Sequence, residues 1–188
     1  MPEVELTLIA ISASESQKGN FVLVFEENES FRRLPIIIGD YEAQAIAIAL
    51  ERMSPDRPMT HDLFYNAISQ LDAKLVKVII HKVENGVFFS HLILAAPSGE
   101  LVIDSRTSDA VALAVRFRCP IYTTEEVMSK VSIVLDDPSD AFTNKRGRLE
   151  DYSIEELERI LEKLLQKEDY RSAVRVRNAI KLKRKDSN

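Results

Sequence analysis

Short runs in which polar and apolar residues alternate occupy the first part of the chain, and this period of two predicts β-strands. Between them lie alanine-rich segments whose apolar residues recur at helical spacing. The first such helix is apolar on nearly all sides, so we expect it to be buried. The predicted elements are strands at Glu3–Ser12, Phe21–Phe25 and Arg33–Ile38, and helices from Tyr41 to about Arg52 and over His61–Leu71. Asp40 and Thr60 are placed to cap these two helices.

The same order of elements is predicted a second time further along the chain. An offset of 67 residues aligns Gly19 with Gly86 and Glu42 with Asp109, and it also superimposes the alanines of the two helices. Matches of several residue types in one register indicate an internal duplication of a β-β-β-α unit. The second set is predicted as strands Leu75–Lys82, Val87–Ala95 and Leu101–Asp104, a helix Arg106–Arg116, a strand Pro120–Tyr122 and a helix Thr124–Ser129.

These elements predict an α+β domain over residues 1–135, with copies at about 3–70 and 71–131 and a mostly antiparallel sheet. The polar segment 136–149 is predicted to be a linker. Residues 150–185 are predicted to form a helical hairpin that begins with a capping box of Ser153 and Glu156. Its first helix is expected to carry an apolar seam of Ile154, Leu157, Leu161 and Leu164. One stripe of its second helix is expected at Tyr170, Ala173, Arg177 and Ile180.

Composition narrows the class of protein. No apolar run approaches the roughly 20 residues of a membrane helix, and the N-terminus lacks the basic flank of a signal peptide. Cys119 is the only cysteine, which indicates a cytoplasmic protein. It lies between an apolar helix and Pro120, so it is expected to be a buried, inert thiol. The net charge of −5 argues against strong non-specific binding of nucleic acid. Basic residues gather near the C-terminus, where they either face solvent or bind nucleic acid or a partner: Arg171, Arg175, Arg177 and Lys181.

The nucleotide-binding and hydrolase motifs GxGxxG, HExxH and GxSxG are absent. Candidate chemistry therefore lies where strands give way to helices, because helix N-termini attract anions. Glu42, Asp104 and Asp109 could share a divalent cation through carboxylate oxygens, and Arg106 could hold a phosphate. The alternative is structural, with Ser105 or Thr107 capping the helix and Arg106 pairing with an acid.

A second group of candidates surrounds the start of the helix at His61. His61 could act as a general base that Asp62 orients, although a histidine in a first helical turn is often only a surface residue. Asp40 occupies the corner of the first copy that matches the Arg106 region, and Ser108 follows Arg106 in the second copy.

Three segments, "LPIIIGDYEAQAIAIAL", "RPMTHDLFYNAI" and "DSRTSDAVALAVRFRCPIYTTEEVM", resemble the bifunctional nuclease domain family. The tail "LEKLLQKEDYRSAVRVRNAI" resembles a UVR motif, the helical hairpin of excision-repair proteins. The first resemblance implies a duplicated α+β fold and nuclease activity on DNA and RNA. Candidate site residues at the matching motifs are Asp40, Glu42, His61, Asp62, Asp104, Arg106, Ser108 and Asp109.

Two hypotheses follow. In the first, the chain is an intracellular nuclease in which Glu42, Asp104 and Asp109 hold Mg²⁺ or Mn²⁺, with no organic cofactor, and His61 activates water. Arg106 then stabilises the phosphate charge, and the hairpin binds a partner protein or nucleic acid. In the second, the chain is a non-enzymatic adaptor in DNA repair or stress response. Self-association is expected in either case, and no membrane contact is.

Overall fold

The computed structural model describes residues 3–28, 32–134, 149, 152–166 and 170–186. They form two compact units, Met1–Asn28 with Arg33–Ile133, and Glu29–Arg32 with Val134–Asn188. Apart from Leu149, the expected linker 136–149 lies outside the described residues.

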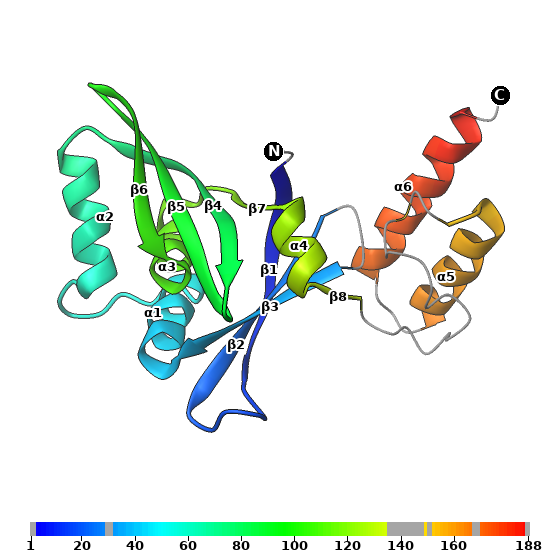
Figure 1. Ribbon diagram of the computed structural model, residues 1–188, viewed down its shortest axis with the longest axis horizontal. Coiled ribbons are helices and arrows are strands. Elements are labelled where there is room, and N and C mark those ends of the chain that lie inside the picture. The colour runs from blue at the N-terminus through cyan, green and yellow to red at the C-terminus, as the bar shows by residue number, and fades with distance from the viewer. Residues whose placement is uncertain (1–2, 29–31, 135–148, 150–151, 167–169, 187–188) are drawn as a thin grey trace. The chain divides into compact units, whose positions relative to one another are not determined.

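A mixed α+β arrangement with a mostly antiparallel sheet is confirmed (Figure 1). The elements as far as residue 134 are β1 (Glu3–Ala13), β2 (Asn20–Glu27), β3 (Arg32–Gly39), α1 (Asp40–Leu50), α2 (Thr60–Gln70), β4 (Lys74–Glu84), β5 (Val87–Ala96), β6 (Gly99–Arg106), α3 (Thr107–Phe117), β7 (Ile121–Thr124), α4 (Glu125–Val131) and β8 (Ile133–Val134). The strand order in the sheet is β6-β5-β4-β7-β1-β2-β3-β8. β7 pairs in parallel with β4 and antiparallel with β1, so it joins two antiparallel three-stranded sets.

Each three-stranded set leads directly into a helix. β3 continues into α1 and β6 into α3, and adding 67 to the bounds of β3 and α1 gives the bounds of β6 and α3. Gly19 and Gly86 lie at the corresponding turns between the first two strands of each set, with φ of 86° and 78°. Glycine suits both turns because residues with a Cβ rarely adopt this left-handed conformation. The order strand-strand-strand-helix thus occurs twice.

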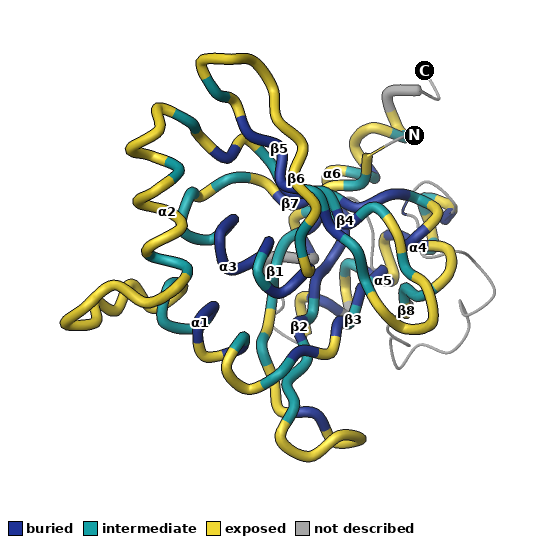
Figure 2. Tube along the Cα trace, turned by 60° about the vertical axis from the view of Figure 1, so that its left-hand side comes forward, coloured by how far each residue is buried: buried dark blue, intermediate teal, exposed yellow. Residues whose placement is uncertain are grey.

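The core of the unit that contains residues 33–133 lies around α3. The helix buries seven residues, among them Ala110, Ala112 and Ala114, and it contacts α1, α2, β4, β5 and β6. α1 buries Ala43, Ala45 and Ile46. Small side chains on both helices let their backbones approach closely, as the alanine spacing indicates. α2, by contrast, has no buried residue, and Figure 2 shows it as mostly exposed beside the buried α3.

The expected caps at Asp40 and Thr60 are wrong. Both residues are the first of their helices, and the N-cap positions are Gly39 and Met59. At α1 the strand runs straight into the helix with no intervening turn, and Gly39 at the N-cap position has no side chain that could cap the helix. At α2 the Met59 N–H donates to the Asp62 carboxylate over 2.9 Å, which satisfies this group from inside the helix.

The C-terminal hairpin consists of α5 (Ile154–Gln166) and α6 (Tyr170–Asp186), which contact each other. The capping box is present: the Ser153 N–H donates to Glu156 over 2.6 Å, and the Glu156 N–H donates to Ser153 Oγ over 3.2 Å. The hairpin has an apolar core of its own, made of Leu149, Tyr152, Leu157, Ile160, Leu164, Ala173, Val176 and Ile180. Val176 takes the core place expected of Arg177, which is exposed.

Across the described residues, none of the helices has the length and apolarity needed to cross a membrane.

The packing of α1 gives a first prediction. Ile46 is fully buried, whereas Tyr41 on the same helix is 84% exposed. Ile46→Ala should lower the free energy of unfolding by about 2–5 kcal/mol, because it removes apolar contacts and leaves a cavity. Tyr41→Ala should change it by less than about 0.5 kcal/mol. Urea unfolding of the full chain measures both, and equal effects would contradict this packing of α1.

Candidate functional site

The Arg106 guanidinium joins the first turns of two helices. Arg106 is the last residue of β6 and the N-cap of α3. Its Nε and Nη2 donate to Asp109 over 2.8 and 3.2 Å, and its Nη1 donates to Glu42 of α1 over 3.1 Å. The hydrogen bond and charge of Asp109 raise the pKa of Arg106, burial opposes this slightly, and Glu42 adds to it.

His61 of α2 joins the same group through Asp109. His61 Nε2 lies 3.0 Å from Asp109 Oδ1, and the His61 side chain is only 15% exposed. Burial works against ionisation of Asp109, but the bonds from Arg106 and His61 outweigh it, and the pKa of Asp109 lies below its ordinary value. We call His61, Glu42, Arg106 and Asp109 the Arg106 cluster. Three helices that are separate in sequence thus meet at their starts.

The Arg106 cluster has the parts of an acid–base site for an anionic substrate. The Arg106 side chain is 68% exposed, and a guanidinium has five N–H groups, of which the contacts above use three. An ionised carboxylate can only accept, so in neutral His61 the proton lies on Nε2 and the lone pair on Nδ1. Nδ1 can then take a proton from water, and Arg106 can bind a phosphate oxygen.

Asp62 is turned toward a different partner. Its carboxylate accepts from Arg116 Nε of α3 over 2.7 Å, and the Arg116 side chain is only 7% exposed. Arg116 Nη1 also donates to the carbonyl oxygens of Ala45 and Ala112, over 3.1 and 2.9 Å. Asp62 therefore helps to fix α1, α2 and α3 together and does not orient His61. Asp62 and Arg116 both border a cavity of about 430 Å³.

Burial opposes ionisation of Asp62, yet the hydrogen bonds from Arg116 and the Met59 N–H outweigh it. The pKa of Asp62 consequently lies below its ordinary value of 3.8.

Besides Asp62, three candidate residues lie outside the Arg106 cluster. Asp40 is exposed at the start of α1, and Ser108 is buried in the first turn of α3. Asp104 lies two residues before Arg106 on β6, but its carboxylate lies close to His81 and His91.

The expected magnesium or manganese site of Glu42, Asp104 and Asp109 is therefore not formed by the described residues. Arg106 already neutralises Glu42 and Asp109, and the third carboxylate lies elsewhere. The donor set does not fit such an ion, because hard cations need several free oxygen ligands in one place.

Sequence reasoning missed a group made by His81, His91 and Asp104. Asp104 is the cross-strand partner of His91 in the antiparallel pair β5–β6. The pairing of β4 with β5 shifts at a bulge between Ile80 and Lys82, so His91 faces Ile79. His81 then shares the face of His91, because side chains two apart on a strand point the same way. Without the bulge, a one-residue change of register would place the two histidines on opposite faces.

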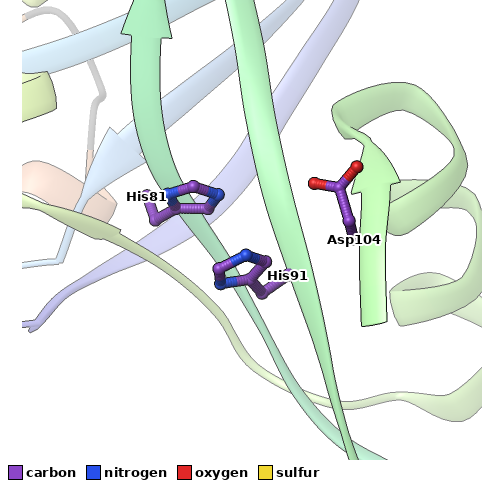
Figure 3. A group of neighbouring side chains, drawn as sticks. All are labelled: His81, His91 and Asp104. Carbon is purple, nitrogen blue, oxygen red and sulfur yellow. The ribbon is translucent and has the colours of Figure 1, made fainter. Parts of the chain in front are cut away.

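His81 and His91 lie ring to ring, with centroids 3.8 Å apart and planes tilted by 18°. Burial lowers the pKa of His81, the neighbouring His91 and Lys82 lower it further, and Asp104 opposes them. Figure 3 shows the two imidazoles side by side, with the Asp104 carboxylate directed toward them from β6.

The candidate binding residues of the hairpin lie on α6. Arg177 and Lys181 are exposed and Arg175 is partly buried, whereas the side chain of Arg171 lies outside the described residues.

Cys119 agrees with its expected inert role, because burial raises the pKa of its thiol to about 11 and thereby keeps it protonated near neutral pH.

The Asp62–Arg116 pair gives a second prediction. Asp62→Asn should lower the free energy of unfolding by about 1–3 kcal/mol near neutral pH, because the almost buried guanidinium loses its charged partner. The folded pKa of Asp62 is depressed, so its contribution is complete above 3.8 and disappears as the pH falls through the lower folded value. The difference from wild type should be complete near neutral pH and should shrink toward zero in acid, once the pH lies below the folded value.

Asp72→Asn serves as the matched control, because Asp72 is an exposed carboxylate just beyond α2. It should show no such difference in urea unfolding at either pH. A deficit in Asp62→Asn that persisted unchanged in acid would rule out the ionised pair as its source.

Comparison with known proteins places the chain in a family. The model of the bifunctional nuclease domain matches residues 23–136. Two relatives are uncharacterized proteins of Mycobacterium tuberculosis, from strains CDC 1551 / Oshkosh and ATCC 25618 / H37Rv. Each is 36% identical over 140 residues, which cover 74% of this chain and 82% of the relative. The matched segment contains all four residues of the Arg106 cluster, and the chain belongs to the bifunctional nuclease domain family.

Proposed function

We propose that the protein hydrolyses phosphodiester bonds in DNA or RNA at the Arg106 cluster. The observation that carries the proposal is the shared carboxylate of Asp109, which contacts His61 and Arg106 at once. A base and a phosphate-binding group are thereby held side by side. Membership of the bifunctional nuclease domain family supports a nuclease-like function.

Each residue of the cluster has a distinct role in this reaction. Arg106 binds a non-bridging phosphate oxygen and stabilises the charge that develops on it. His61 Nδ1 takes a proton from the attacking water, or from a ribose hydroxyl in RNA. The phosphorus–oxygen bond to the departing nucleotide breaks, and solvent water protonates the leaving oxygen. Asp109 holds the imidazole in place and stabilises the imidazolium that forms. Glu42 of α1 accepts a hydrogen bond from Nη1 of Arg106 and thereby fixes the orientation of the guanidinium.

The substrate proposed for this site is a single strand. The net charge of −5 works against tight binding of a duplex, and an exposed guanidinium at a helix start can bind one backbone phosphate of a flexible chain. The single, protonated Cys119 supports the cytoplasmic setting expected for such an enzyme.

A third prediction tests this proposal. The full chain, purified from a nuclease-deficient host, should cleave single-stranded DNA or RNA. His61→Gln should slow cleavage by about 100-fold or more, because it removes the base. Arg106→Gln should slow it by a similar factor through lost phosphate binding. The assay is run with and without chelator on end-labelled oligonucleotides.

Asp72→Asn, purified in parallel, should cleave as fast as wild type, because it lies outside the cluster. Equal residual activity in wild type, His61→Gln and Arg106→Gln would point to a contaminating enzyme and remove the assignment. Absence of cleavage in every sample would favour the adaptor hypothesis instead.

The separate hairpin supports a partner-binding role, either alongside catalysis or in a non-enzymatic adaptor. It builds its own core and leaves Arg177 and Lys181 exposed on α6. We propose that this basic surface, together with Arg171 and Arg175, binds a protein partner or nucleic acid in the manner expected of a UVR-like motif.

We further propose that the two β-β-β-α stretches arose by duplication. The equal offset of β3 with α1 and of β6 with α3 supports this. So does the chemistry of the cluster, because Glu42 and Asp109 are equivalent positions under that offset and both bind Arg106.

Self-association is proposed from the apolar surface of α2 and β6. Leu63 and Phe64 of α2 are 62% and 56% exposed, and β6 is an edge strand whose Val102 is 56% exposed. Exposed apolar side chains and an unpaired strand edge both favour contact with another chain.

The fourth prediction follows from this surface. The wild-type chain should have at least twice the monomer mass in light scattering coupled to gel filtration, and Leu63→Ser with Phe64→Ser should shift it toward the monomer. A polar surface position serves as control: Lys130→Ser, at an exposed position of α4, should leave the mass unchanged. A monomeric wild type at high concentration would contradict the proposal.

A further inference from the structure

We propose that His81, His91 and Asp104 bind one divalent transition-metal ion of the zinc class. Each residue offers one ligand atom, and these atoms all lie within 4.8 Å of one another. Two ligand atoms bound to the same zinc at about 2.0–2.1 Å are somewhat closer than this. The two imidazoles are stacked, so one ring must turn out of the stack to bring the three ligands onto one ion.

Backbone hydrogen bonding fixes where the three ligands start. His81 lies at the bulge of β4, His91 in the middle of β5, and Asp104 opposite His91 on β6. Three adjacent strands thus supply one ligand each from one face of the sheet (Figure 3). Ligands on strands are held more exactly in place than ligands on loops. Bulges are commonly used to redirect a side chain in this way.

The state of His81 is a second observation that points to a ligand. Its Nε2 is buried and has no hydrogen-bond partner among the described residues. A buried polar atom without a partner is unfavourable, because the water it lost on burial is not replaced by another contact. A bound cation would satisfy this nitrogen directly, once the ring turns out of its stack with His91.

The donor set selects the class of ion. Two imidazoles and one carboxylate suit zinc and related transition metals, whereas magnesium and calcium prefer oxygen ligands throughout. Three protein ligands also leave a position open on a tetrahedral ion, and Asp104 is exposed, so that position can face solvent. The site is distinct from the Arg106 cluster, and the inference does not rest on nuclease activity.

The test is a titration of the full chain with Zn²⁺ and Co²⁺. After treatment with a chelator and its removal, the wild type should bind one equivalent of Zn²⁺ in competition with a chromophoric chelator. It should also develop the visible absorption of coordinated Co²⁺. His91→Gln and Asp104→Asn should each weaken Zn²⁺ binding by more than about 100-fold, because loss of a ligand exceeds the effect of losing its outer-shell support.

The chain offers a matched control, because it has three histidines and the third, His61, lies in the Arg106 cluster. His61→Gln should bind Zn²⁺ as wild type does, and excess Mg²⁺ should not displace the ion. Added Zn²⁺ should raise the melting temperature of wild type and of His61→Gln, but not that of Asp104→Asn. The test changes Asp104 and not His81, because Asp104 is exposed. A folding defect caused by a change at His81 therefore cannot obscure the result. No uptake by wild type, equal uptake by all variants, or displacement by Mg²⁺ would overturn the site.

Discussion

The ionic contact of Arg106 with Glu42 and Asp109 determines how the candidate site is assembled. Both carboxylates lie in first helical turns, Glu42 in α1 and Asp109 in α3. Acidic side chains are favoured at that end of a helix, yet two brought close together repel each other. One guanidinium between them removes this repulsion, and the same Asp109 carboxylate then places His61 of α2 beside Arg106. Glu42, Asp109 and His61, one from the first turn of each helix, therefore lie in a single network around Arg106.

This convergence depends on how closely the helices can pack. Small residues on the facing sides of α1 and α3, such as Ala45 and Ala112, allow their backbones to approach. Because the helices lie close together, Arg116 of α3 contacts all three of them. Its Nη1 donates to the carbonyl oxygens of Ala45 and Ala112, and its Nε donates to Asp62. Two arginines of the segment that ends β6 and forms α3 therefore secure the same three helices at two places. The first leaves its guanidinium largely exposed for chemistry, whereas the second is almost completely buried.

Much of the fold was accessible from the sequence, because period-two and alanine-rich patterns report which faces must be buried. The predicted cation site placed Glu42 beside Asp109, and in the structure the two residues share Arg106 instead of an ion. The capping box of α5 was predictable, but the cap of α1 was not, because β3 runs into α1 without a turn. The separation of Asp104 from Asp109 was missed for a related reason: residues near in sequence were assumed to face one site, although Asp104 lies on a strand and Asp109 on a helix. The histidine pair depends on a bulge at His81, and no residue pattern marks that change of register.

The central claim is that His61 and Asp109 act as one catalytic unit beside Arg106. A double-mutant cycle on the cleavage rate of a single-stranded oligonucleotide tests it most directly, with His61→Ala, Asp109→Ala and the double variant compared at one pH. Residues that work as a unit are strongly non-additive, since loss of either one already removes their joint contribution. We predict that the double variant is no slower than the slower single variant. Rate losses that multiply, as for two independent sites, would contradict the account.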